Sequence, residues 1–129
     1  MKIKQVIVIR ADLKVRRGKE IAQGCHSSLA FLTRQLQGSN FSSGQYIIHL
    51  TDVAKQWIDT DFRKIVVRVD SEAELLEIES KAKEAGVECH LVTDNGLTEF
   101  HGIPTTTCLA LGPDESEKID AITGHLKLY

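Results

Sequence analysis

Runs of apolar residues alternate along the chain with segments of helical periodicity. Residues 4–10, KQVIVIR, are β-branched and almost continuously apolar, which predicts a strand covered on both faces. Residues 64–69 and 88–93 predict a second and a third strand, and residues 106–111 predict a fourth. Strands that alternate with helices favour one α/β domain, and we expect it to span residues 1–129.

Residues 18–37 predict the first helix, between the first two strands. Apolar side chains recur there at spacings of three and four, on a stripe made by Ile21, Cys25, Leu29, Leu32 and Leu36. Lys19 and Gln23 share the polar face opposite, and His26 and Ser27 extend it. That face is either the solvent side of an amphipathic helix or part of a site.

Three further helices follow with different signals. Residues 38–44 predict a loop, and residues 51–58 a short helix. Ser71 and Glu74 form a capping box that opens the next helix, whose inward stripe is expected to comprise Leu75, Ile78, Ala82 and Ala85. Pro113 and the acidic residues after it predict the start of a last helix that ends at Gly124.

The connections predict how the strands run. β-α-β units with right-handed crossovers make the first three strands parallel, whereas the short, helix-free link to the fourth suits an antiparallel partner. Ligands in such sheets gather at the carboxyl ends of the parallel strands. Two polar segments emerge there, residues 11–19 and residues 94–98. The first surrounds a helix start, which already favours an anion.

The charges are unevenly placed in a chain whose net charge is only −2. Residues 1–36 carry eight Lys and Arg against two acidic residues, a balance of +6, and the remaining 93 residues carry −8. This asymmetry is typical of a protein with one phosphate-facing surface. The alternative is a basic loop that is merely solvated.

Several classes of protein are disfavoured by what the chain lacks. The apolar opening, residues 3–9, is too short for a signal-peptide core or a membrane span, so we expect a cytoplasmic protein with no membrane partner. Cys25, Cys89 and Cys108 suit a reducing compartment as free thiols. Cys25-His26 and Cys89-His90 are adjacent pairs without metal-ligand spacing, and the chain has neither G-x-G-x-x-G nor G-x-x-x-x-G-K-[ST], so neither a metal site nor a cofactor is expected. Cys25 could act as a nucleophile, but its place on the apolar stripe favours a packed core thiol.

Four blocks of sequence together resemble one known family. VIVIRADLKVRRGKEIAQGCHSS near the start, LVTDNGLT, TCLALGP and the ending TGHLKLY occur in order over nearly the whole chain. In this respect the chain is similar to the archaeal and eukaryotic-type, or type 2, peptidyl-tRNA hydrolases. The resemblance implies a three-layer α/β/α fold with a mixed four-stranded sheet, a homodimer, and metal-independent hydrolysis of peptidyl-tRNA that frees tRNA and peptide.

The resemblance also transfers functional roles onto individual residues. The family block D-L-K-x-x-x-G-K-x-A-A-Q is matched from Asp12 to Gln23, with Ile21 in place of the first alanine, so Lys19 inherits a catalytic role and Gln23 a substrate-binding one. His26 follows at the family's spacing. The block D-A-G-x-T is matched by Asp94, Gly96 and Thr98, with Asn95 in place of alanine and Leu97 where arginine is common.

The threonine that opens the family's last strand corresponds to Thr107, with Thr106 as the alternative, because the loop before it is about one residue longer than usual. The expected catalytic set is therefore Lys19, Asp94, Thr98 and Thr107, and the expected substrate-binding set is Gln23, His26, Lys14, Arg16 and Arg17. In this hypothesis Asp94 orients or deprotonates a water and Lys19 stabilises the developing negative charge. Two rival interpretations are a catalytically inactive tRNA- or protein-binding module of the same fold and a cysteine hydrolase acting through Cys25.

Overall fold

The computed structural model describes residues 2–39, 41–97 and 99–129. Its strands are β1 (Ile3–Arg10), β2 (Phe41–Ser42), β3 (Gln45–Tyr46), β4 (Lys64–Val69), β5 (Cys89–Asp94) and β6 (Thr105–Glu115). Its helices are the short 3-10 turn η1 (Ala11–Leu13), α1 (Arg17–Gln37), α2 (Asp52–Asp59), α3 (Glu72–Ala85) and α4 (Ser116–Thr123). The strands and helices expected from the sequence are present, and most bounds agree within one residue.

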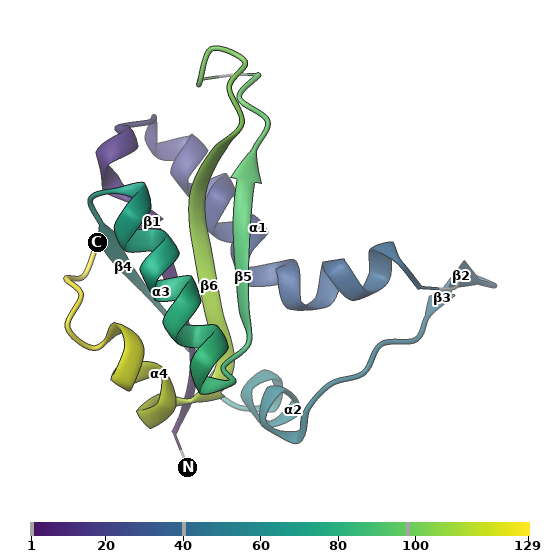
Figure 1. Ribbon diagram of the computed structural model, residues 1–129. Coiled ribbons are helices and arrows are strands. Elements are labelled where there is room, and N and C mark those ends of the chain that lie inside the picture. Colours follow the sequence, from purple (N-terminus) through teal and green to yellow (C-terminus); the bar gives the residue numbers. More distant parts are fainter. Residues whose placement is uncertain (1, 40, 98) are drawn as a thin grey trace.

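A mixed four-stranded sheet forms the centre, in the order β4-β1-β6-β5 (Figure 1). β1 pairs with β4 in parallel, as predicted, and β6 is antiparallel to both β1 and β5. The prediction of a parallel set of three strands is confirmed only for this one pair, since within the described sheet β5 is hydrogen-bonded to β6 alone. β6 inserts between the two strands whose ends were expected to carry the site.

The end of β6 differs from the prediction. Pro113 was expected to start the last helix, but the strand continues through it: Asp114 pairs with Lys4 and Glu115 pairs with Ile3. Helix α4 begins only at Ser116. Proline followed by acidic residues is typical of a helix start, yet here the available pairing edge of β1 keeps these residues extended.

Helices cover both faces of the sheet. On one face α3 and α4 pack onto a large cluster that includes Val8, Leu75, Leu109 and Ile119. As predicted, the hydroxyl of Ser71 accepts the N–H of Glu74, and Gly86 closes α3 in the left-handed conformation. On the other face α1 and α2 pack onto two smaller clusters, formed by Ile3, Phe31, Ala54 and Trp57 and by Ile7, Ile9, Cys108 and Ala110.

Helix α1 meets the sheet through a different side from the one that its apolar stripe predicts. The buried residues of α1 are Gln23, Ser27, Ser28, Ala30 and Phe31. Ile21, Cys25 and Leu29 of the predicted stripe are exposed instead. Short side chains let the helix approach the sheet closely, so the stripe is turned toward an open groove beside β1 and β4.

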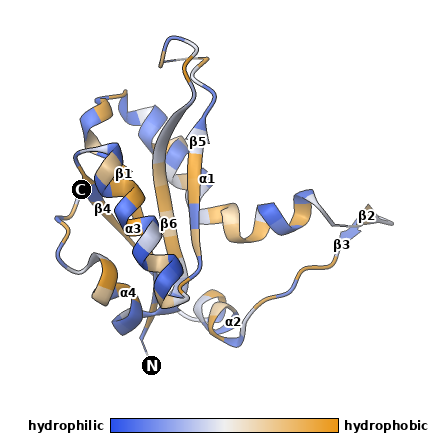
Figure 2. Cartoon of the chain, in the orientation of Figure 1, coloured by the Kyte–Doolittle hydropathy of each residue, from blue (hydrophilic) through white to orange (hydrophobic). Residues whose placement is uncertain are grey.

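The second half of α1 extends beyond the sheet and carries the β2–β3 hairpin away from the body of the molecule (Figure 1). β2 lies in residues 38–44, which were predicted to be a loop, and β3 follows directly after them. Coloured by hydropathy, β5 and β6 stand out as hydrophobic strands at the centre (Figure 2). In the described ranges, no helix has both the length and the apolar character that a membrane crossing requires.

Candidate active site

An ion pair joins the two segments that the sequence placed at the site. Nζ of Lys19 lies 2.7 Å from Oδ2 of Asp94, and both side chains are largely shielded from solvent. Lys19 belongs to the first turn of α1, and Asp94 is the last residue of β5. Because α1 packs across β6 onto β5, the pair forms although β1 and β5 are not neighbours.

The surroundings of Asp94 keep its carboxyl ionised. The hydrogen bond from Lys19 is the main cause that lowers the pKa of Asp94 below its usual value. The N–H of Gly96 donates to Oδ1 over 2.6 Å and acts in the same direction, as do the charges of Lys19 and His26. Partial burial opposes them and is outweighed. An ionised carboxylate is an acceptor for water rather than a strong base.

Gly96 fixes the backbone after Asp94. Its φ is +83°, and a Cβ atom at this position would lie 2.4 Å from the carbonyl oxygen of Ile103. The N–H of Gly102 also donates to the carbonyl of Gly96 over 2.9 Å. Only glycine fits both the left-handed conformation and this close approach. The glycine of the Asp94-Asn95-Gly96 motif thus holds the loop of residues 95–104 against itself.

The two candidate threonines face different surroundings. Thr107 is completely buried, and its hydroxyl donates to the carbonyl of Val92 over 3.4 Å. The β6 register shifts at this point, since Val92 pairs with Cys108 and Thr93 with Thr106. The hydroxyl of Thr106 donates to Glu72 of α3, on the other face of the sheet.

Geometry therefore favours Thr107 over Thr106 as the threonine beneath the site. Thr98, the other threonine of the expected catalytic set, lies outside the described residues.

Gln23 lies buried between α1 and β6. The thiol of Cys108 donates to its backbone carbonyl over 3.3 Å, which ties the helix to the sheet below Lys19. Within the described part of the chain, Nε2 of Gln23 has no hydrogen-bond partner. An unpaired buried amide costs about 1–3 kcal/mol, so it is usually retained for a reason. The polar face predicted for α1 is in this respect an inner face, not a solvated one.

The expected tRNA-contacting residues are spread around the start of α1. Lys14 is exposed and adopts the left-handed conformation after η1. Nε of Arg16 lies 2.7 Å from Oε1 of Glu99, which links the helix start to the loop of residues 95–104. Arg17 instead lines the groove beside β1. His26 is exposed, close enough to Asp94 for its charge to act on that carboxyl.

The groove on the other side of α1 has a volume of about 780 Å³. Its apolar lining includes Ile7, Ile21, Leu29 and Phe62. Cys25 also lines it and is exposed, so the prediction of a packed core thiol is wrong. This surface is formed by the apolar stripe of α1 that the sequence placed in the core.

The other two cysteines are poor nucleophiles. Burial raises the pKa of the Cys89 thiol to about 12, and burial also raises the pKa of Cys108. A nucleophilic cysteine needs a thiolate, which such shifts suppress. Across residues 2–39, 41–97 and 99–129, no group of three or more His, Cys, Asp or Glu side chains is placed to hold a metal ion.

Sequence reasoning missed two contributors. Glu99 was not singled out, although it is the only acidic residue in residues 95–104. The start of that loop was predicted to lie at the same sheet edge as the basic residues 11–19, one of which, Arg16, pairs with it. Cys108 was considered only as a thiol, and its contact with the carbonyl of Gln23 depends on which face of α1 meets the sheet. The first could have been found from charge complementarity, and the second had no signal in the sequence.

Comparison with known proteins places this geometry in a family. The family model described as peptidyl-tRNA hydrolase PTH2 matches residues 3–129. The chain belongs to the PTH2 family. A peptidyl-tRNA hydrolase from Methanothermobacter thermautotrophicus is 43% identical over 126 residues, which cover 98% of this chain and 99% of that protein. One from Methanocaldococcus jannaschii is 39% identical, with 98% and 99% covered.

Two further comparisons concern a longer relative and a protein that shares only the fold. A probable peptidyl-tRNA hydrolase 2 from Dictyostelium discoideum is 42% identical over 98% of this chain but only 54% of its own length. A solved structure of a protein of unknown function from Agrobacterium tumefaciens has a TM-score of 0.60 at 13% identity, covering 100% of this chain and 98% of its own. That structure supports the fold alone. The PTH2 relatives favour an enzyme over a non-catalytic binding module.

Proposed function

We propose that Lys19 and Asp94 are the catalytic pair with which this PTH2 protein hydrolyses the ester bond of peptidyl-tRNA. The observation that carries the proposal is their 2.7 Å contact at the shielded junction of α1 and β5. A cation and an ionised carboxylate held together suit ester hydrolysis, because one can stabilise negative charge while the other orients water.

The reaction follows from the charges of the pair. A water held by Asp94 attacks the ester carbonyl carbon, and the negative charge that develops on the carbonyl oxygen is stabilised by Lys19. The bond between that carbon and the ribose oxygen then breaks, which releases a peptide with a free carboxylate and a tRNA with a free ribose hydroxyl. Since the pKa of Asp94 is lowered, its main role is to position the water. One proton of that water ends on the departing ribose oxygen, and the other is released to solvent as the peptide carboxyl ionises.

The neighbouring residues support this pair in different ways. Thr107 is completely buried, so it acts as a positioning residue for β5 rather than by touching substrate. Gln23 is also buried, with an Nε2 that has no hydrogen-bond partner among the described residues, so we propose that it shapes the site below Lys19 rather than touching the substrate from its present position. His26 and Thr98 complete the proposed site, Thr98 as the residue that would hold the water with Asp94.

The tRNA is proposed to lie along the basic start of α1. Lys14 and Arg16 are exposed on the same side as the loop that follows Asp94, and Arg17 extends the positive surface toward the groove. Phosphate contacts by such residues supply binding that depends on salt but does not depend on sequence. The balance of +6 in residues 1–36 supports this placement.

A homodimer through the groove is the assembly that the surface supports. Ile21 and Leu29 are 61% and 49% exposed beside a 780 Å³ apolar groove, which is unfavourable in water. Sedimentation of Leu29→Glu tests this: a dimeric parent and a monomeric variant support the interface, and a monomeric parent contradicts it.

The cytoplasm is the proposed location, and a single domain the proposed unit. Peptidyl-tRNA is made and consumed where translation takes place, and Cys25, Cys89 and Cys108 are all free thiols.

The function is tested by turnover of an N-blocked aminoacyl-tRNA by purified protein after exhaustive chelation. Full activity supports hydrolysis by side chains and water, whereas activity that vanishes and returns with added zinc contradicts it.

A further inference from the structure

The loop of residues 95–104 presents two exposed apolar side chains, one on each side of its turn. Leu97 is 79% exposed and Ile103 is 63% exposed. The backbone brings their positions together, because Gly96, which precedes Leu97, packs directly against the backbone of Ile103. A tight turn between them is closed by the N–H of Ile103, which donates to the carbonyl of Phe100 over 2.9 Å. We call Leu97 and Ile103 the apolar tip.

The apolar tip is tied to the proposed catalytic pair. Leu97 follows Asp94 by three residues, so their Cα atoms are at most about 11 Å apart. The N–H of Leu97 donates to the side chain of Asn95 over 3.1 Å, and that of Gly96 donates to Asp94. Glu99 is paired with Arg16 of the helix start. These contacts hold the tip at the rim of the site.

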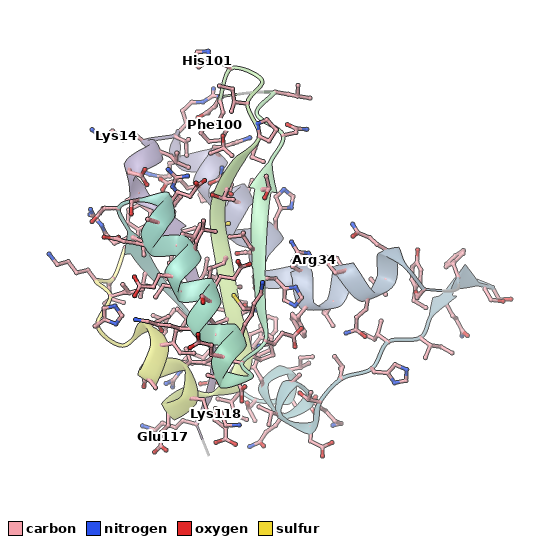
Figure 3. The ribbon with its side chains drawn as sticks, viewed as in Figure 1. Lys14, Arg34, Phe100, His101, Glu117 and Lys118 are labelled. Carbon is pink, nitrogen blue, oxygen red and sulfur yellow. The ribbon has the colours of Figure 1, made fainter. Side chains whose placement is uncertain are left out.

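Figure 3 shows where this rim lies in the molecule. Phe100 and His101 stand at the end of the loop, at the same end of the molecule as Lys14. The substrate must therefore pass both the basic start of α1 and the loop of residues 95–104 when its ester reaches Lys19 and Asp94.

The chemistry of the loop matches one part of the substrate. Residues 95–104 contain no Lys or Arg, and their only acidic side chain, Glu99, is paired with Arg16, so the loop itself offers no cation to phosphate. A surface for the tRNA backbone needs cations, which the start of α1 has and this loop lacks. Peptidyl-tRNA has one further part, the peptide, which is attached at the ester and is largely uncharged. Covering exposed leucine and isoleucine with apolar side chains of a peptide lowers the free energy.

We propose that the apolar tip, Leu97 and Ile103, binds apolar side chains of the peptide and makes the enzyme prefer peptides that carry them. A single exposed apolar side chain would need no explanation. Leu97 and Ile103 together, at the rim of the site, form an apolar surface next to the reacting bond. This proposal rests on the placement of the ester at Lys19 and Asp94.

The test compares two substrates built on one tRNA. One carries an N-acetylated leucine dipeptide and the other an N-acetylated glycine dipeptide, so that only the peptide differs. The ratio of kcat/KM for leucine over glycine is measured for the parent and for Leu97→Ser and Ile103→Ser. We expect the parent to prefer leucine and each variant to lose about fivefold to tenfold of that ratio, the size of a lost apolar contact.

Matched variants separate a peptide contact from a general defect. Ile47→Ser removes an equally exposed side chain, 79%, on the distant hairpin arm and should leave the ratio unchanged. Leu97→Met keeps an apolar side chain and should keep the ratio. Equal losses on both substrates, or an unchanged ratio in both serine variants, would overturn the proposal. Failure of the catalytic pair would appear separately, as normal turnover by Lys19→Met.

Discussion

Nζ of Lys19 lies 2.7 Å from Oδ2 of Asp94, across the junction where the start of α1 meets the end of β5. The two residues are far apart in the sequence, with 74 residues between them. The pair brings together the two segments on which the proposed site depends. Its electrostatics lead directly to a pH prediction.

On the acid side, the activity should fall only at low pH, where Asp94 becomes protonated. Lys19 lowers the pKa of Asp94, so the carboxylate persists until the pH falls below the usual titration range of an aspartate. For a carboxyl with a lowered pKa in the folded state, the stabilisation is present above the unfolded pKa and is lost as the pH falls through the folded value. NMR titration of Asp94 in the parent and in Lys19→Met should show a higher pKa in the variant. Identical titrations would mean that Lys19 does not control this carboxyl.

Glycine substitutions should separate the loop at the site from an ordinary helix end. Gly96→Ala meets the backbone of Ile103 at 2.4 Å, so we expect turnover to fall by about tenfold or more as the loop shifts away from Asp94. Gly86→Ala has a similar φ, +70°, but open space, and should cost only about 1 kcal/mol of stability with normal turnover. Thermal unfolding and kinetics of both variants are the measurement, and equal turnover in the two would refute the role given to the Gly96 loop.

The two threonines should differ in their effects. Thr107→Val removes a hydroxyl buried against β5, and we expect turnover to fall by about tenfold with little change in KM. Thr106→Val removes a hydrogen bond to Glu72 on the other face, and turnover should stay near that of the parent. The reverse pattern would assign the site threonine to Thr106.

Binding of tRNA should depend on salt through the start of α1. Replacing Arg16 and Arg17 together by Gln should raise KM and reduce its salt dependence by roughly one unit of slope per lost phosphate contact, with much less effect on turnover. A control that neutralises Lys81 and Lys83, which pair with glutamates on α3, should change neither. Kinetics across a salt series decide this, and unchanged slopes in the arginine variant would place the tRNA elsewhere.

The sequence predicted the elements well because their signals are local. The run at residues 4–10, the capping box at Ser71 and the stop at Gly86 each depend on neighbours in the chain, and the structure confirms them. It did not predict which face of α1 meets the sheet. Gln23 is buried and Ile21 exposed, because close packing through short side chains outweighed the apolar stripe.

The remaining differences come from long-range pairing. β6 runs on through Pro113 because β1 offers pairing partners there. The proline signal for a helix start depends only on neighbouring residues, so it does not take this pairing into account. The link between Arg16 and Glu99 likewise depends on how a loop folds back onto a helix 83 residues away in sequence. Residue spacing alone could place Lys19 and Asp94 at one edge of the sheet, whereas their contact needed the order of the strands.

The most direct test of the catalytic pair is the turnover number of Lys19→Met and Asp94→Asn on peptidyl-tRNA. Lys4→Met is the matched control, since Lys4 is also well shielded and ion-paired, with Asp120, far from the site. We predict that each site variant loses about a hundredfold or more in turnover, with folding intact, while the control keeps the parent rate. Folded Lys19→Met and Asp94→Asn proteins that turn over at near-parent rates would contradict the account.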